Sequence, residues 1–358
     1  MKIGAGLCDY QRVDPKNRLN KDELKVNSNI ARVRSRGMKL KDDYVTLSHG
    51  AGGKASAALV DQVFVSGYGN EVLAELTDAG VLPLAELLGE VAGSEDADCG
   101  GGKLAMSTDS YVVNPIVFPG GSIGELAVNG TVNDLAVSGA IPKVISAGFI
   151  LEEGLPIADL RREVQAMREA AENAGVRIVT GDTKVVPKGS GDKLFINTAG
   201  IGIVPGDRQL GASQVQRGDR IIVSGAIADH GMSVMMARGD LAIEAPIKSD
   251  TRAVNHLVEA LMTAVPQTRW MRDATRGGLG TVLNELAVAT GWGIAIEDES
   301  LPVHDMTRGA CDMLGIDPIY VANEGMFCAV VPADQVDTAL AALRALPGGE
   351  EAANICLL

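Results

Sequence analysis

The chain has 358 residues, 46% of them hydrophobic and 22% charged, which is more than one ordinary compact domain holds, so two domains are expected. Its formal net charge of −14 excludes a protein that binds nucleic acid through a basic surface. No stretch is apolar over the length of a membrane crossing, and the start lacks an apolar signal core, so we expect a cytoplasmic protein without a membrane segment. Five scattered cysteines without a CxxC pair predict neither a disulfide framework nor a zinc site.

The first part of the chain is predicted to contain an arm and an α/β domain. Residues 1–44 are polar and indicate a weakly ordered N-terminal arm. In residues 45–205, strands alternate with helices. The clearest helix begins at Pro156 and ends at Gly175. One face of that helix is apolar and should cover a sheet; it carries Ile157, Leu160, Val164, Met167, Ala171 and Ala174. A strand at 177–180, a loop at 181–184 and a long β-rich run at 194–204 follow.

A segment rich in Gly, Asp, Gln and Arg, residues 205–219, is the predicted linker to a second domain. Residues 206–358 are expected to form an α+β domain. The overall prediction is therefore a two-domain α/β and α+β protein. Strands are expected at 219–224 and 326–331, and helices at 254–264, 279–290 and 333–346.

A glycine-rich phrase runs from His49 to Lys54 and contains Gly50, Gly52 and Gly53. Such a turn lets backbone amides approach phosphate oxygens, and a following lysine adds a positive charge. The full P-loop pattern is absent, so a nucleotide loop and a plain turn both remain open.

Three carboxylates stand in loops or beside predicted elements. Asp109 lies in a predicted loop, 108–110, that follows an apolar run. Asp134 lies with Asn133 inside the helix-like segment 123–139, and Asp182 lies between Gly181 and Thr183 after a strand. If they converge, they are suited to Mg²⁺, which prefers oxygen ligands beside substrate phosphates. Each alone is more often a cap or turn, except Asp134, which needs a compensating partner on an apolar helix.

Further phrases add candidate binding and proton-transfer groups. Asp273, Thr275, Arg276 and Gly277 precede a helix, so they suit an anion or form an ordinary helix N-cap. Glu324 lies between two apolar runs and is either a base of raised pKa or a solvated turn residue. The remaining histidines carry less information: 229–231 is expected to be a glycine-rich turn, and His256 and His304 are expected at the surface.

Taken together, these phrases resemble the HypE family of carbamoyl dehydratases in [NiFe]-hydrogenase maturation. That family belongs to the superfamily of aminoimidazole ribonucleotide synthetase, and the resemblance runs in order over nearly all of the chain after residue 38. It is carried by TDSYVVNP (108–115), FPGG (118–121), GTVNDLAVSGA (130–140), ILEEG (150–154), VTGDTKVV (179–186), ADHG (228–231), TRGGL (275–279) and YVANEG (320–325).

The resemblance implies the aminoimidazole ribonucleotide synthetase-like fold, with the N-terminal sheet pairing in a homodimer. It implies ATP and Mg²⁺ in a cleft, with Asp109, Asp134 and Asp182 near the metal and phosphates and the 49–54 segment closing over them. Lys184 and Glu324 would handle protons while an S-carbamoyl cysteine is dehydrated to a thiocyanate. The implied partners are the carbamoyltransferase HypF and HypC- and HypD-type maturation factors.

The C-terminus departs from the family pattern. Members of the family end in a flexible tail whose last residue is the carbamoyl-accepting cysteine, whereas this chain ends two residues after Cys356, where the family is still finishing a strand. Cys356 is therefore expected to be a poor acceptor, and the C-terminal domain is expected to be truncated. Two alternatives follow: a catalytically impaired maturation scaffold, and a sister ATP-dependent synthetase or kinase acting on a small molecule.

Overall fold

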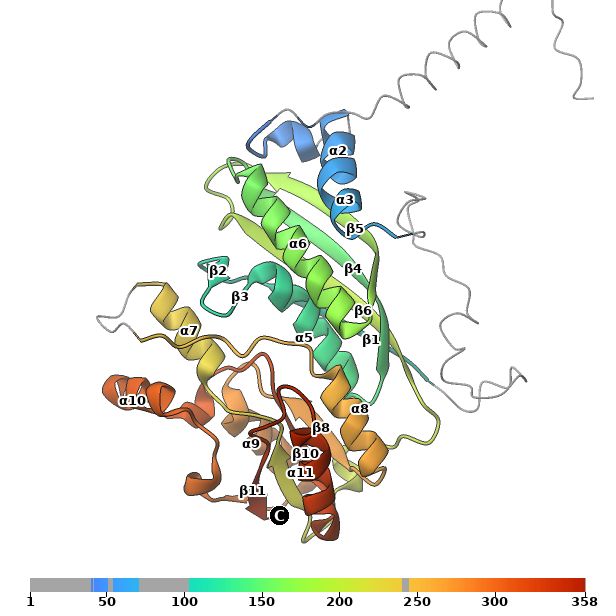
Figure 1. The fold of residues 1–358 in the computed structure, drawn as a ribbon, viewed down its shortest axis with the longest axis vertical. Coiled ribbons are helices and arrows are strands. Elements are labelled where there is room, and N and C mark those ends of the chain that lie inside the picture. The colour runs from blue at the N-terminus through green and yellow to red at the C-terminus, as the bar shows by residue number, and fades with distance from the viewer. Residues whose placement is uncertain (1–39, 41, 51–53, 71–102, 240–244, 358) are drawn as a thin grey trace, which may run out of the picture.

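The computed structural model describes residues 40, 42–50, 54–70, 103–239 and 245–357. These residues form two units, one above the other in Figure 1, joined by the segment 205–219. The only regular element in that segment is the short helix η4 (Ala212–Gln214). None of the described helices combines the length and the apolar character that a membrane crossing requires.

The N-terminal unit is built on a four-stranded sheet in the order β1-β6-β4-β5. The strands are β1 (Lys103–Tyr111), β4 (Ile141–Glu152), β5 (Arg177–Val186) and β6 (Leu194–Val204). β6 pairs antiparallel with both β1 and β4, whereas β4 and β5 are parallel and are connected by the helix α6 (Ile157–Ala174). A short hairpin of β2 (Val117–Phe118) and β3 (Gly121–Ser122) precedes α5 (Ile123–Val137).

Two helices cover one face of this sheet. The predicted apolar face of α6 is confirmed, since all six of its expected residues are buried, and Gly175 ends the helix in the left-handed conformation. α5 is buried almost all round, because it lies between the sheet and the C-terminal unit. Four small elements pack near β5 and α6 at the far end of the unit (Figure 1). They are η1 (Leu47–Gly50), α2 (Lys54–Leu59), the π-helical η2 (Val60–Val65) and α3 (Ser66–Tyr68).

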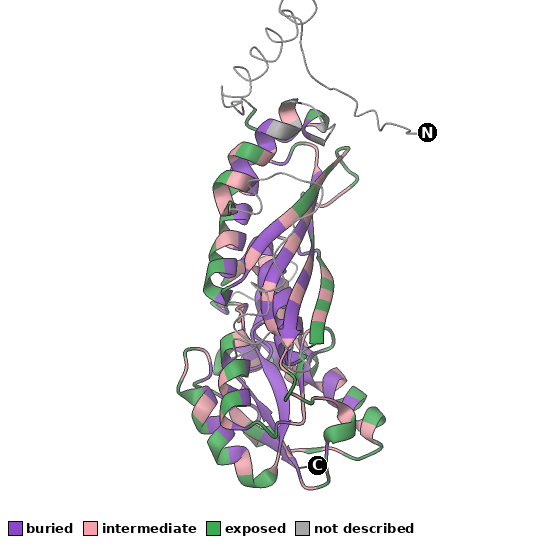
Figure 2. Cartoon of the chain, turned by 90° about the vertical axis from the view of Figure 1, so that its right-hand side faces the viewer, coloured by how far each residue is buried: buried purple, intermediate pink, exposed green. Residues whose placement is uncertain are grey.

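The opposite face of the sheet, which we call the outer face, is covered by no described helix (Figure 2). Successive side chains of a strand point to opposite faces, so every second residue of β1 is exposed. Leu104 and Met106 on β1 and Ile150 on β4 are large apolar side chains that remain exposed there. An apolar patch of this kind is typical of a protein–protein contact.

The C-terminal unit contains a five-stranded antiparallel sheet in the order β8-β10-β7-β11-β9. The helices α8 (Asn255–Ala264) and α11 (Val336–Arg344) pack with one set of its core side chains, and α9 (Gly278–Thr290) packs with the other. The strands are β7 (Arg220–Val223), β8 (Trp270–Asp273), β9 (Ala295–Ile296), β10 (Phe327–Val331) and β11 (Ala353–Leu357). The helices are α7 (Asp229–Ala237), α8 (Asn255–Ala264), α9 (Gly278–Thr290), α10 (Asp305–Leu314), α11 (Val336–Arg344), η5 (Asp298–Ser300), η6 (Pro318–Tyr320) and η7 (Ala333–Gln335).

Most predicted elements are confirmed, and three predicted loops are wrong. Residues 108–110 lie inside β1 and residues 181–184 lie inside β5, because both are edge strands on which polar residues alternate without breaking the ladder. The expected turn at 229–231 is instead the first turn of α7. Of the expected N-terminal arm, residues 1–39 and 41 lie outside the described residues, whereas Tyr44 pairs with Pro156 through a β-bridge.

Candidate active site

A cavity of about 820 Å³ lies where the two units meet. The N-terminal unit contributes β1 and the second half of α5, and the C-terminal unit contributes β8, the loop that follows it, and α9. The cavity therefore exists only because both units are present. Its polar lining includes Ser107, Thr108, Asp109, Asp134, Arg272, Asp273, Thr275, Arg276, Thr281, Glu285 and Glu324.

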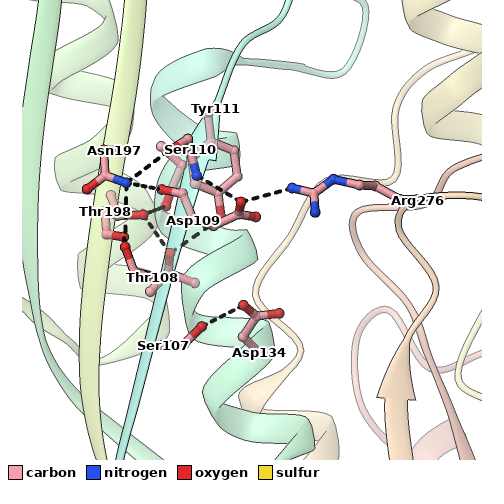
Figure 3. A network of polar contacts seen from close by, with 11 residues as sticks. Ser107, Thr108, Asp109, Ser110, Tyr111, Asp134, Asn197, Thr198 and Arg276 are labelled. Carbon is pink, nitrogen blue, oxygen red and sulfur yellow. Dashed lines mark hydrogen bonds and ion pairs between the residues drawn. The ribbon is translucent and has the colours of Figure 1, made fainter.

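β1 and α5 bring two of the predicted carboxylates together. Asp109 and Ser107 are two residues apart on β1 and therefore share the face that α5 covers. The Ser107 hydroxyl donates a hydrogen bond of 2.7 Å to Asp134 Oδ2, which satisfies an acid on an otherwise apolar helix (Figure 3). The expected partner of Asp134 is thus a serine on the neighbouring strand.

Arg276 connects the two units across the cavity. Its guanidinium nitrogen lies 3.1 Å from Asp109 Oδ1. Figure 3 shows the two side chains pointing toward each other. The side chain of Arg276 is 87% exposed, so the pair contributes little to stability and remains available to an anion. The alternative that Asp273 or Thr275 caps α9 is wrong, because the N-cap residue is Gly277, in a left-handed conformation without a side-chain cap.

The carboxyl groups of the cavity repel one another. Burial and then the charge of Asp134 raise the pKa of Asp273 to about 7. Burial raises the pKa of Glu324 well above its ordinary value, and the charges of Asp250, Asp273, Asp109 and Asp134 add to the shift. The pKa of Asp134 is also raised, chiefly by burial. A cavity of this kind favours a cation, or the protonated form of its acids.

The expected convergence of three carboxylates within one chain is not met, because Asp182 lies elsewhere. β5 is three strand positions from β1, which corresponds to about 14 Å. Asp182 is also in register with Gly148, Asn197 and Ser110, a row that points to the outer face, whereas Asp109 points inward. Gly181, Thr183 and Lys184 share β5, and none of them lines the cavity.

The elements η1 and α2, which hold the described residues of the 49–54 segment, also lie away from the cavity, at the other end of the N-terminal unit (Figure 1). His49 is buried there, with Nδ1 accepting a hydrogen bond from the Thr46 amide and Nε2 3.5 Å from Asp42. Gly50 ends η1 and Lys54 begins α2, while Gly52 and Gly53 lie outside the described residues.

Two further predicted residues are buried and face away from the cavity. The Asn133 side chain donates to the carbonyls of Arg252 and Glu324 and accepts from the Val254 amide, so it links α5 to the C-terminal unit. Cys356 lies in β11, paired with Ile221 and Ile296, and burial raises the pKa of its thiol to about 11. Burial and a raised pKa both make such a thiol a poor nucleophile, because the thiolate is the reactive form.

Sequence reasoning missed Ser107, Arg272 and Asp250. Alternation along 103–111 could have placed Ser107 beside Asp109, because residues two apart share a face of a strand. Arg272 immediately precedes the predicted site residue Asp273, but it belongs to no recognisable motif. Asp250 lies in a segment without helix or strand, 74 residues from its partner Glu324, so no local signal marks it.

This two-unit fold, with acidic groups of both units around one cavity, defines an AIR synthase-related protein. The models for the N-terminal and C-terminal domains of that group match residues 77–204 and 216–355. The chain is 46% identical over 318 residues to the carbamoyl dehydratase HypE of Azotobacter vinelandii, covering 89% of each chain. It therefore belongs to the carbamoyl dehydratase HypE family.

Solved structures of HypE proteins agree with this assignment. A hydrogenase maturation protein HypE in complex with ATP is 44% identical and has a TM-score of 0.79, with 87% of this chain and 88% of that chain covered. A HypE–HypF complex is 42% identical with a TM-score of 0.70, covering 84% of this chain and 92% of that chain. The fold of the described residues is thus that of HypE proteins.

Proposed function

We propose that the cavity between the units binds ATP and uses it to dehydrate an S-carbamoyl cysteine to an S-cyano cysteine, for the cyanide ligands of [NiFe]-hydrogenase. The observation that carries the proposal is the presence of Asp109, Asp134 and Glu324, from both units, in one cavity. The ATP complex of a relative and the name carbamoyl dehydratase of others support it. No described thiol lines the cavity, so the carbamoylated cysteine has to enter from outside it.

The chemistry requires a leaving group where the carbamoyl oxygen stands. That oxygen attacks the γ-phosphorus of ATP, the bond to the bridging oxygen breaks, and ADP leaves. The nitrogen then loses both of its protons, the C–O bond to phosphate breaks, and the C–N triple bond forms. One proton ends on the departing phosphate and the other goes to solvent through a base, so ATP and carbamoyl give ADP, phosphate and thiocyanate.

Asp109 and Asp134 are the proposed holders of Mg²⁺ with the ATP phosphates. Magnesium is usually bound by one or two carboxylates, with phosphate oxygens and water completing its shell. Among the described residues, no trio of His, Cys, Asp or Glu side chains is arranged as a complete metal site. When bound, the ion offsets charge on the transferring phosphoryl group. Arg276 and Thr275 remain to contact the phosphates.

Glu324 is the proposed base that removes an N–H proton from the phosphorylated intermediate. Burial and four neighbouring carboxyls raise its pKa, and a higher pKa makes the ionised form a stronger base. A bound cation and an ionised guanidinium in the cavity would favour that ionised form. The raised pKa increases the proton affinity of the Glu324 carboxylate, which is the direction that removal of a weakly acidic N–H requires.

Asp182 and Lys184 are proposed to act across a homodimer formed through the outer face. Both lie on that face beside exposed apolar side chains, among them Ile150, which is in register with Lys184. Pairing two such faces would bury the apolar patch and bring these polar groups to the cavity edge of the partner subunit.

Mixed dimers test that arrangement. Lys184→Ala and Glu324→Gln chains are each expected to be inactive alone. After the two are mixed and exchanged, about a quarter of wild-type turnover should return, because half of the dimers are mixed and each has one intact site. No recovery, despite demonstrated exchange, would place Lys184 in the cavity of its own chain. A Lys184→Ala chain that is active alone would place Lys184 outside the reaction.

The partners proposed are a HypF-type carbamoyltransferase, which supplies the carbamoyl group, and HypC- and HypD-type factors, which receive cyanide. The HypE–HypF complex of a relative supports the first of these. In the decisive experiment, the chain is incubated with carbamoyltransferase, carbamoyl phosphate and ATP. The mass of every cysteine-containing peptide is then measured by mass spectrometry. Loss of one water from the carbamoylated peptide, dependent on ATP, is the expected result. A carbamoylated peptide that persists while ATP is bound would instead support a scaffold.

A further inference from the structure

The turn that carries Glu324 is held from one side by Asp250. The Glu324 amide donates to Asp250 Oδ1 over 3.1 Å, and the Gly325 amide donates to Oδ2 over 3.0 Å. The backbone segments around Asp250 and Gly325 approach so closely that a Cβ on Gly325 would lie 1.8 Å from the Asp250 carbonyl oxygen. Only glycine fits at that position, so the bond pair depends on the Glu–Gly sequence.

The other side of the turn is held by two side chains. Asn133 donates to the Glu324 carbonyl over 3.2 Å, and the Nε of Arg252 donates to the Gly325 carbonyl over 2.8 Å. All four backbone polar groups of Glu324 and Gly325 are therefore bonded to side chains of Asp250, Asn133 and Arg252. Such complete bonding fixes the direction in which the Glu324 side chain leaves the backbone.

Asp250 also acts on the charge of Glu324. After burial, it is the strongest of the influences that raise the pKa of Glu324, ahead of Asp273, Asp109 and Asp134. Burial raises the pKa of Asp250 itself to about 6, while the two amide bonds and Arg252 lower it. Asp250 does not line the cavity, and its contact with the cavity runs through the turn of Glu324 and Gly325.

We infer that Asp250 is a positioning residue, whose carboxylate holds the backbone of Glu324 in place and keeps a negative charge beside the base. The inference rests on the proposed role of Glu324 as base. Asp250 does two things at once, since it fixes where the base stands and it strengthens the base. A purely structural residue would do only the first.

The test uses the full chain with Asp250→Asn, which keeps the size and one acceptor oxygen but removes the charge. Turnover should fall by about 10- to 10²-fold, from misplacement and from the weaker base. The KM for ATP should change by less than about threefold, because Asp250 does not line the cavity. The acid limb of the pH–rate profile should move to lower pH, since a neighbouring negative charge has been removed.

Asp219→Asn is the matched control. Asp219 is also a buried aspartate that accepts a backbone amide, that of Gln216, and it pairs with Arg269 outside the cavity. Its replacement should lower the melting temperature while turnover stays within about twofold and the pH profile stays in place. A profile shifted equally in both variants, or in neither, would overturn the inference for Asp250.

A double variant separates this inference from the proposed function. If Asp250 acts through Glu324, then Asp250→Asn with Glu324→Gln should be no slower than Glu324→Gln alone. If the double variant is slower by the full factor of Asp250→Asn, Asp250 acts independently and the inference fails while the base role stands. If Glu324→Gln turns over normally, the base role fails and the inference falls with it.

Discussion

The two faces of the N-terminal sheet carry similar residues in different surroundings. On the inner face, Asp109 meets α5 and the C-terminal unit, and its neighbours are Asp134, Arg276 and a buried cavity wall. On the outer face, Asp182 and Lys184 stand beside exposed Leu104, Met106 and Ile150. The comparison teaches that an acidic phrase does not define a site by itself; the sheet face and the strand position decide which groups it meets.

The cavity beside the inner face should be most sensitive at Glu324. We expect Glu324→Gln to lower turnover by about 10²- to 10⁴-fold, because general-base assistance is removed. ATP binding, measured by calorimetry, should change little, since the amide keeps the size of the carboxyl. Turnover within a few-fold of wild type would remove Glu324 from the mechanism and leave the cavity without a base.

A charge at Met106 should disrupt the proposed dimer contact on the outer face. Met106→Lys is expected to yield monomers in sedimentation measurements and to lower turnover by about 10²-fold, because the partner's groups are lost from the cavity. Met313→Lys on α10 is the control, since both methionines are 67% exposed. If the Met106 variant stays dimeric and active, the outer face is not the dimer contact.

The repulsion within the inner cavity should appear as a stability that depends on pH. The pKa of Asp273 is raised from 3.8 to about 7 in the folded chain, so folding loses stability as pH rises through that interval. Asp273→Asn should therefore gain up to about 4 kcal/mol over wild type at pH 8 and almost nothing near pH 4. Urea unfolding at both pH values checks this. Asp334 is exposed, so Asp334→Asn is the control, and its free energy of unfolding should differ from that of wild type by the same amount at both pH values.

The smallest effect is expected at Cys356. Cys356→Ala should lower the free energy of unfolding by about 1 kcal/mol, because one sulfur is removed from the core of the C-terminal unit. Turnover should not change. A folded Cys356→Ala chain that no longer forms the cyano product would identify this thiol as the acceptor after all.

The sequence predicted the elements better than their arrangement. The amphipathic pattern of 157–174 and the apolar runs of β6, β7 and β10 were read correctly because they are local. The hydrophobic pattern carries no information on the strand order β1-β6-β4-β5. That order places Asp109 and Asp182 on opposite edge strands of the sheet. Strand order is set by contacts between distant segments, so one sequence could not exclude a shared site for the two.

The candidate site was predicted in part for the same reason. Asp109, Asp134, Thr275, Arg276 and Glu324 share one cavity, and they were found as phrases next to apolar runs. The support around them was missed, since Ser107 and Asp250 act through hydrogen bonds to partners 27 and 74 residues away. A role that depends on such distant contacts leaves no trace in local composition or periodicity.

The way α5 is buried has a consequence for how the molecule unfolds. Ala136 and Val137, near its end, belong to the same core cluster as Ile222 and Leu257 of the C-terminal unit. Each unit buries part of its apolar core against that helix. We therefore expect the two units to unfold together on heating, in a single cooperative step. Expressing either half alone should then give an insoluble or molten product, even though each half has its own sheet.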